Sequence, residues 1–309
     1  MKIFVAGASG AIGERLVTQL VERGHEVVGT TRSHEKVDRL RQRGAQPLVL
    51  DVLDRAGVRQ AVLASRPDAI VHEATALAGV HDFRDFDRSF ELTNRLRTEG
   101  TDALLAAAQE SGVERFVAQS FAGWPYERDG GPVKSEDDAL DPEPVESMRE
   151  TLAAIRHLER AVLDAGGIVL RYGGFYGSRD DPQAEMVRRR RFPIIGGGSG
   201  MLSFVHLEDA ATATVLAVEH GEGGIYNVVD DEPAPVREWL PVLAETLGAK
   251  PPRHVPPWLA RLLAGEAAVV LMTDARGASN AKAKRELGWK LRYPSWRQGF
   301  AATYGGGAR

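Results

Sequence analysis

Three glycines near the start of the chain have the spacing of a phosphate-binding turn. Gly7, Gly10 and Gly13 follow the apolar run of residues 2–6 and precede an amphipathic stretch. Glycine permits a sharp turn at position 7, close approach to a ligand at 10, and tight packing of helix on strand at 13. Free N–H groups at the start of that helix would then bind a diphosphate. The residues predicted to contact a dinucleotide in this turn are Gly7, Ser9, Gly10, Ala11, Ile12 and Gly13.

The segment after the second expected strand, residues 26–30, bears on which dinucleotide binds. An acidic residue there accepts hydrogen bonds from the 2′-hydroxyl of NAD, whereas an arginine suits the 2′-phosphate of NADP. Arg32 and Ser33 occupy this position, and Glu35 lies too far along the chain to act as the acidic partner. The sequence therefore favours NADP(H), with NAD(H) as an alternative. The other interpretation of Arg32 is a solvated loop cation.

Two more strand ends offer contacts to the same ligand. The strands are expected at residues 46–50 and 69–72, and the residues that follow them are Asp51, Val52, Glu73, Ala74 and Thr75. The first two place a carboxylate and a neighbouring amide where the adenine edge would lie. Small residues in the second segment let the backbone lie against the cofactor. Strand and helix signals that alternate in this way predict an α/β fold with a parallel sheet covered on both faces.

Composition limits the classes of partner. The chain of 309 residues carries 39 Lys and Arg against 43 Asp and Glu, and a net charge of −4 gives no general attraction to nucleic acid or anionic membranes. The absence of cysteine excludes disulfides and thiolate catalysis, and no metal-ligand spacing is present. No signal-peptide pattern and no apolar run of about 18 residues occur. We therefore expect a cytoplasmic protein without nucleic-acid or membrane partners.

Seven blocks of sequence occur in an order known from one family. They are the glycine turn, V-H-E-A-T-A at 71–76, F-V-A-Q-S at 116–120, L-R-Y-G-G-F-Y-G at 170–177, S-F-V-H-L-E-D-A at 203–210, Y-N-V-V-D-D-E-P at 226–233 and L-G-W at 287–289. On these blocks the chain resembles the extended short-chain dehydrogenases/reductases, the epimerase/dehydratase-like group. The resemblance runs from Lys2 to about Phe300 and implies a Rossmann-type doubly wound sheet with a smaller C-terminal substrate lobe.

The resemblance also implies domain boundaries and an assembly. The expected segments are a dinucleotide-binding domain at 1–173 plus 204–228, a substrate-binding lobe at 174–203 plus 229–297, and a C-terminal tail at 298–309. It places Tyr172 and Phe175 beside the cofactor and Tyr176 in the substrate pocket. Relatives often dimerise through two long helices, which begin here near Phe90 and Glu146, so a homodimer is expected.

One part of the family pattern is missing. In the family, a serine or threonine after the fifth strand polarises the substrate oxygen, and a Y-x-x-x-K pair on the next helix relays a proton. Ser120 matches the first. Met148 and Leu152 stand in place of the pair, or Ser147 and Thr151 in the neighbouring register. Residues four apart share a helix face, so neither register presents an acid–base pair. The chain therefore resembles the atypical branch of the family.

Tyr126 is the candidate that could replace the missing proton donor. It follows the fifth expected strand, in a loop with Trp124, and open α/β sheets bind substrates at the carboxyl ends of their strands. The alternative is that Tyr126 only packs beside Trp124. Met148, Leu152 and Trp124 would line the substrate pocket.

The substrate lobe argues against a nucleotide sugar. Relatives that use such substrates carry an arginine where this chain has Leu202, which favours an uncharged, rather apolar metabolite. The arginine-rich run at 186–191 is interpreted as a solvated helix end, with a phosphate site as the alternative. Two functions stay open: an NADP(H)-dependent oxidoreductase or isomerase acting on a carbonyl or conjugated metabolite, with Ser120 orienting its oxygen, and a non-catalytic NAD(P)-binding sensor.

Overall fold

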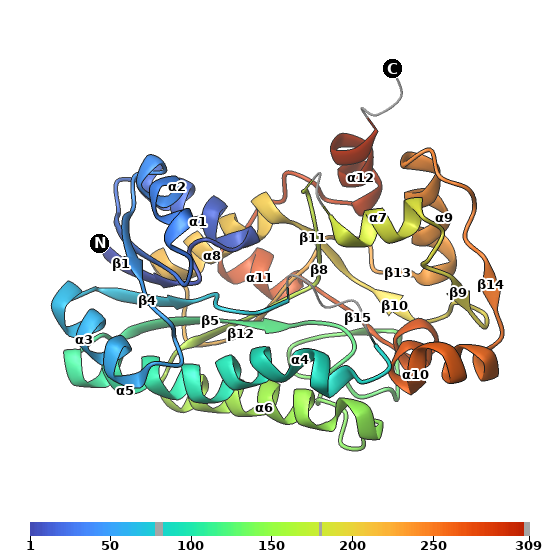
Figure 1. The fold of residues 1–309 in the computed structure, drawn as a ribbon, viewed down its shortest axis with the longest axis horizontal. Coiled ribbons are helices and arrows are strands. Elements are labelled where there is room, and N and C mark those ends of the chain that lie inside the picture. Colours follow the sequence, from blue (N-terminus) through green and yellow to red (C-terminus); the bar gives the residue numbers. More distant parts are fainter. Residues whose placement is uncertain (78–82, 179–180, 306–309) are drawn as a thin grey trace.

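A single parallel sheet forms the centre of the protein. The computed structural model describes residues 1–77, 83–178 and 181–305. The strands of the sheet are β1 (Lys2–Ala6), β2 (Glu26–Thr31), β3 (Gln46–Val49), β4 (Ala69–His72), β5 (Arg115–Phe121), β7 (Ile168–Tyr172) and β12 (Gly224–Val228). They pair in the order β12-β7-β5-β4-β1-β2-β3, and every pair is parallel (Figure 1). The prediction of a doubly wound parallel sheet is confirmed.

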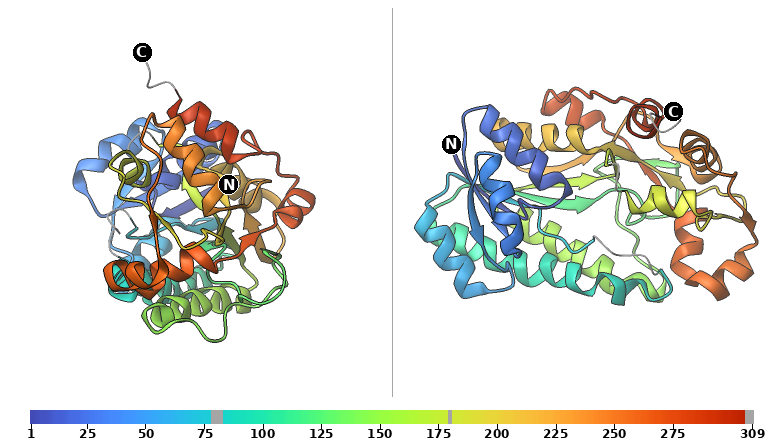
Figure 2. Two further views of the ribbon diagram at one scale, coloured as in Figure 1. Left: turned by 90° about the vertical axis from the view of Figure 1, so that its right-hand side faces the viewer. Right: turned by 45° about the horizontal axis from the view of Figure 1, so that its top comes forward.

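Helices cover both faces of this sheet (Figures 1 and 2). One layer contains α1 (Ala11–Glu22), α2 (Val37–Gln42), α8 (Leu207–His220) and α11 (Ala281–Glu286). The other contains α3 (Arg55–Ser65), α4 (Phe86–Arg95), the π-helical turn η2 (Leu96–Gly100), α5 (Thr101–Ser111), the 3₁₀ turn η3 (Glu146–Met148) and α6 (Arg149–Asp164). No helix in the described part of the chain is both long and apolar enough to span a membrane.

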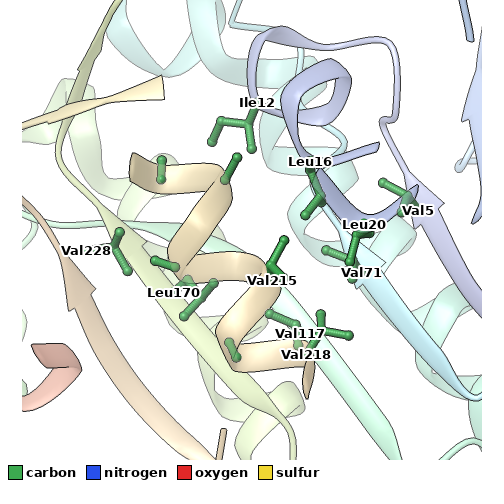
Figure 3. Close-up of a cluster of buried hydrophobic side chains, with 14 of the residues drawn as sticks. Val5, Ile12, Leu16, Leu20, Val71, Val117, Leu170, Val215, Val218 and Val228 are labelled. Carbon is green, nitrogen blue, oxygen red and sulfur yellow. The ribbon is translucent and has the colours of Figure 1, made fainter. Parts of the chain in front are cut away.

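The alternation of strand residues builds a separate core on each face. In β1, Ile3 and Val5 belong to the cluster beneath α1 and α8, whereas Phe4 and Ala6 belong to the cluster beneath α3, α5 and α6. Side chains two residues apart in a strand share a face, so an unbroken apolar strand can fill both cores. Figure 3 shows the first core, where Leu16 and other α1 side chains meet those of α8 and the sheet.

The second lobe is built from short elements beyond the carboxyl ends of the strands. They are β8 (Gly174–Tyr176), α7 (Pro182–Arg188), β9 (Ile194–Ile195), β10 (Met201–Leu202), β11 (Phe204–His206), β13 (Ala234–Pro235), α9 (Val236–Thr246), β14 (His254–Val255) and α10 (Pro257–Thr273). The strand β15 (Gly277–Ala278) pairs with β6 (Val133–Lys134). Arg188 and Arg189 both form ion pairs with Glu185 at the end of α7, as in a solvated helix end.

The C-terminal segment differs from the expected tail. Helix α12 (Trp296–Tyr304) packs against α9, and Phe300 and Tyr304 are buried in the core of the second lobe. The Tyr304 hydroxyl also donates a hydrogen bond of 2.5 Å to Asp181 Oδ2. The aromatic residues of this helix bury enough apolar surface to fix the segment. The boundary at 298 therefore cuts a folded helix, and residues 306–309 lie outside the described residues.

Candidate functional site

A cavity of ≈ 820 Å³ runs across the carboxyl ends of the strands. Its floor is formed by the turn after β1 and by the segments that follow β2, β3 and β4. Phe175, Tyr176, Ser178, Asp181 and Pro182 of the second lobe complete the wall. Ligands of open α/β sheets bind in this position because the strand order reverses there, leaving a crevice between the crossovers.

The glycine turn forms one end of the cavity and leaves no room for side chains. Gly7 has φ 91°, and a Cβ there would lie 2.7 Å from the Glu73 carbonyl carbon. A Cβ on Gly13 would clash with the Gly7 carbonyl oxygen and lie 2.7 Å from the Ala8 carbonyl carbon. Gly10 caps α1 without a side-chain hydrogen bond, so the first N–H groups of the helix are available to an anion. This cradle fits a dinucleotide diphosphate.

Two cations line the cavity after β2, beside the glycine turn. Arg32 and Lys36 are both exposed and both line the wall. The Lys36 ammonium donates a hydrogen bond of 3.4 Å to the carbonyl of Ser9, and the Ser9 hydroxyl donates to Thr31 Oγ1 at 2.9 Å. Ser33 lies between the two cations in the chain and also lines the cavity. Sequence reasoning missed Lys36, which lies in the 3₁₀ turn η1 (His34–Lys36), after the segment that holds Arg32 and Ser33.

The structure sorts the predicted site residues into two groups. Those that line the cavity are Gly7, Ser9, Gly10, Ala11, Ile12, Gly13, Arg32, Ser33, Val52, Glu73, Ala74, Thr75, Phe175 and Tyr176. Those outside its lining are Asp51, Ser120, Trp124, Tyr126, Met148, Leu152 and Tyr172. Asp51 turns back on the chain, where its carboxylate accepts a hydrogen bond from the Leu53 backbone N–H at 3.0 Å. Lining residues that the sequence did not suggest include Thr30, Lys36, Gln119 and Leu207.

Ser120 and Tyr126 meet in a buried polar network instead of in the cavity. The Ser120 hydroxyl donates to Glu159 Oε1 at 2.7 Å, and Glu159 accepts two bonds from the Arg171 guanidinium, at 2.8 and 2.7 Å. Arg171 also donates to the Tyr126 hydroxyl at 3.1 Å, which donates to Asn227 Oδ1 at 2.6 Å. Both hydroxyl groups are occupied and buried. Their expected roles beside a substrate stay predictions.

The alternation of side chains along β5 explains why Ser120 does not reach the cavity. Successive side chains of a strand point to opposite faces, so Gln119 and Ser120 cannot both face the same ligand. Gln119 lines the cavity, and Ser120 points toward α6. The side chain of Gln119, and not that of Ser120, therefore lies at the cavity wall.

The residues in place of the missing Y-x-x-x-K pair are packed. Met148 lies in an apolar cluster with Phe86, whose ring centroid is 5.4 Å from that of Trp124. Leu152 is fully buried. In the neighbouring register, the Thr151 hydroxyl donates to Asp87 Oδ1 at 2.6 Å. The expected pocket residues Trp124 and Met148 thus come together in an apolar cluster with side chains of α4 and α10.

Tyr172 reaches the cavity only through Glu73. Its hydroxyl donates to Glu73 Oε1 at 2.9 Å and lies 2.6 Å from Thr214 Oγ1. Burial raises the pKa of the Glu73 carboxyl to about 8, although the hydrogen bond from Tyr172 acts in the opposite direction. Burial therefore favours the protonated form of this carboxyl at the cavity wall.

Together, the sheet, the glycine turn and the cavity define a Rossmann-type dinucleotide-binding protein of the extended short-chain dehydrogenase/reductase type. The chain belongs to the NAD dependent epimerase/dehydratase family, whose model matches residues 3–229. Membership supports a nicotinamide dinucleotide as the cofactor, and the diphosphate cradle described above fits that group.

Similar proteins include both reductases and epimerases. The 3-diazoavenalumate denitrifying reductase of a Streptomyces species is 44% identical, over 97% of this chain and 99% of its own. A 4-hydroxy-2-methyl-3-oxo-4-farnesyl-3,4-dihydroquinoline-1-oxide ketoreductase of Stigmatella aurantiaca is 29% identical, over 94% of this chain and 92% of its own. The structure of the Thermus thermophilus UDP-glucose 4-epimerase in complex with NAD matches with a TM-score of 0.74, 25% identity and coverage of 100% of both chains.

Proposed function

We propose that the protein is an NADPH-dependent reductase that acts on a small conjugated metabolite. The observation that carries the proposal is one cavity that contains both the diphosphate cradle and, beside it, the cations Arg32 and Lys36. When bound, the reduced nicotinamide supplies a hydride. The naming of two relatives as reductases supports this direction of reaction.

Different residues of the chain are proposed to bind different parts of the cofactor and the substrate. In the proposal, the glycine turn holds the diphosphate and Arg32 with Lys36 holds the 2′-phosphate, because guanidinium and ammonium groups bind phosphate oxygens through charge-assisted hydrogen bonds. Gln119 at the end of β5 offers an amide that can orient a polar atom of the substrate. Tyr176 also lines the cavity, and its buried hydroxyl has no hydrogen-bond partner among the described residues.

The polar groups of the cavity favour one substrate class. An amide such as that of Gln119 does not act as an acid, and burial, followed by the nearby Asp230 carboxylate, raises the pKa of Tyr176 far above its ordinary value. The carboxyl of Glu73 is not free to protonate a substrate either, because Oε1 is hydrogen-bonded to Tyr172 and Oε2 is buried. Reduction of a ketone needs a proton for the new alkoxide. Hydride transfer to an aryl diazonium needs none, because the hydride forms the new C–H bond while the C–N bond breaks and N₂ leaves. The name of the 44% identical relative supports testing diazo compounds first.

Turnover is the test of this proposal. The purified protein is incubated with NADPH and a panel containing aryl diazonium compounds, quinones, enones and ketones, and NADPH oxidation and product formation are measured. We expect NADPH consumption with at least one conjugated member, and stoichiometric N₂ release when that member is a diazo compound. Tight NADPH binding without turnover of any member would contradict the reductase and support the alternative, a binding or sensor protein.

The cofactor preference is tested by removing the cations. We expect Arg32→Ala to weaken NADPH binding about 10- to 100-fold, because one charge-assisted hydrogen bond contributes about 1.5–3 kcal/mol, and Lys36→Ala to act in the same direction. NADH binding should change less than about threefold, since NADH lacks the phosphate. The measurement is a fluorescence titration with each nucleotide. Equal affinities of the wild type for NADPH and NADH would contradict the role of Arg32.

A homodimer and a cytoplasmic location stay predictions.

A further inference from the structure

The guanidinium of Arg15 connects three segments that meet beside the glycine turn. Arg15 lies one turn into α1, and its Nη1 donates a hydrogen bond of 2.8 Å to the carbonyl oxygen of Ala11, at the start of that helix. Its Nη2 donates to the carbonyl oxygen of Gly177, after β8 of the second lobe, at 3.1 Å. Its Nε donates to Glu208 Oε1, in the first turn of α8, at 3.0 Å. One side chain therefore links the helix of the glycine turn to the second lobe.

Gly177 belongs to the segment that forms the second-lobe wall of the cavity. Its neighbours in the chain, Tyr176 and Ser178, both line the cavity. Gly177 has φ 112°, and a Cβ at this position would lie 2.6 Å from Nε2 of the His206 side chain. The backbone of Gly177 thus packs against the ring of His206, while its carbonyl oxygen accepts the bond from Arg15. This bond fixes the wall at the point where it approaches α1.

The order of the strands indicates which half of a dinucleotide this wall would meet. Arg32 and Lys36 line the cavity after β2, which lies on one side of β1 in the sheet. Strand β7, which leads into β8 and the wall, lies on the other side of β1, beyond β4 and β5. Dinucleotides bind across the carboxyl ends of the strands, with the diphosphate at the first turn. With the 2′-phosphate on the β2 side, the nicotinamide half extends toward the wall.

We propose that Arg15 is a positioning residue, which holds the second-lobe wall against the nicotinamide half of the bound cofactor. The proposal rests on the proposed cofactor site. Arg15 is not among the described residues that line the cavity, so it acts through Tyr176 and Ser178. A guanidinium suits this role because it stays charged and carries donors that point in different directions. Without these bonds the wall is less ordered, and the cofactor must order it on binding, which lowers the affinity.

The test compares Arg15→Leu with Arg23→Leu. Arg23 follows the other end of α1 and donates to Glu219 of α8 at 2.6 Å, without a hydrogen bond to the second lobe in the described chain. Its replacement therefore controls for the loss of an ion pair between the same two helices. In a fluorescence titration, we expect NADPH to bind Arg15→Leu about tenfold more weakly than the wild type, since a charged donor is lost. Arg23→Leu should stay within about twofold of the wild type.

Two further measurements separate positioning of the wall from damage to the glycine turn. ADP has the diphosphate but no nicotinamide, so its affinity for Arg15→Leu should stay within about threefold of its affinity for the wild type. Hydrogen–deuterium exchange without nucleotide reports the wall directly. The backbone amides of 174–178 should exchange faster in Arg15→Leu and at the wild-type rate in Arg23→Leu, because only the first variant removes their anchor. Urea denaturation confirms that both variants are folded.

The possible outcomes distinguish this proposal from the proposed function. Wild-type affinity of Arg15→Leu for NADPH, or unchanged exchange at 174–178, would overturn the role of Arg15. Equal weakening of NADPH and ADP would also overturn it, because the effect would then lie at the diphosphate turn. Equal weakening by Arg23→Leu would assign the effect to lost stability and overturn the proposal as well. Absence of NADPH and ADP binding by the wild type would instead contradict the proposed cofactor site itself.

Discussion

Replacing Gly13 by alanine is expected to abolish NADPH binding and to destabilise the protein. The new Cβ would lie 2.7 Å from the Ala8 carbonyl carbon and clash with the Gly7 carbonyl oxygen, both backbone atoms. Backbone atoms cannot rotate away, so the turn and α1 must move apart and the row of N–H groups is lost. We expect at least about a 100-fold weaker affinity for NADPH and a loss of about 2–3 kcal/mol in the free energy of unfolding, as for overpacked sites.

Two other glycines provide matched controls for this prediction. Gly197→Ala adds a methyl group with nothing within 4 Å and should change neither quantity. Gly10→Ala places its Cβ 3.2 Å from the Gly7 oxygen, on the side where the ligand would lie, so it should weaken binding with little loss of stability. NADPH fluorescence titration and urea denaturation measure the two effects. Wild-type NADPH affinity in folded Gly13→Ala would show that the cavity end at this turn is not the diphosphate site.

The second large effect is expected from the buried ion pair between α6 and β7. Burial acts to lower the pKa of Arg171, and the hydrogen bonds and charge of Glu159 more than offset it. Glu159→Leu leaves this guanidinium buried without its carboxylate, which typically costs about 3–5 kcal/mol of stability. We therefore expect urea denaturation to show a loss of that size, because the paired side chains are only 4% and 6% exposed.

Three further variants test this assignment. The double variant Glu159→Leu with Arg171→Leu should be more stable than Glu159→Leu alone, since no charge remains unpaired. Glu110→Ala, which breaks the exposed pair with Arg59, should cost far less. Ser120→Ala should cost about 1–2 kcal/mol and leave NADPH binding and turnover unchanged. If Ser120→Ala lost turnover but kept full stability, that result would support the predicted contact of Ser120 with the substrate.

Gly13 and Ser120 show which kinds of site residue can be placed from the sequence. The position of Gly13 follows from a local motif, whereas that of Ser120 depends on the orientation of a strand. The glycine spacing acts within one strand–turn–helix unit, so its local geometry follows from residues next to one another in the chain. The role expected for Ser120 depended on which face of β5 meets the cavity, and a one-residue difference reverses the direction of a strand side chain. The neighbouring residue Gln119 lines the cavity at the place where Ser120 was expected.

Contacts between residues far apart in the sequence explain the other places where the structure differs from the sequence-based predictions. The segment around residue 298 has aromatic residues four apart, Trp296, Phe300 and Tyr304, a helical spacing that the sequence-based domain boundary did not use. The structure shows what this face packs against, the aromatic core around Trp239 and Phe204. Tyr126 is separated from Asn227 by 101 residues, so no local signal reveals that its hydroxyl is already bonded. A sequence lists polar groups, whereas the tertiary fold determines which of them are still free.

By itself, the sequence determined the parallel α/β architecture, the family and the diphosphate turn, because alternating apolar strands and glycine spacing act locally and repeat along the chain. Only the tertiary structure decided that Ser120, Glu159, Arg171 and Tyr126 form a buried network, that Lys36 joins Arg32 at the cavity, and that burial raises the pKa of Glu73. These properties depend on burial and on partners from distant segments. Desolvation and long-range hydrogen bonds exist only after the chain has folded.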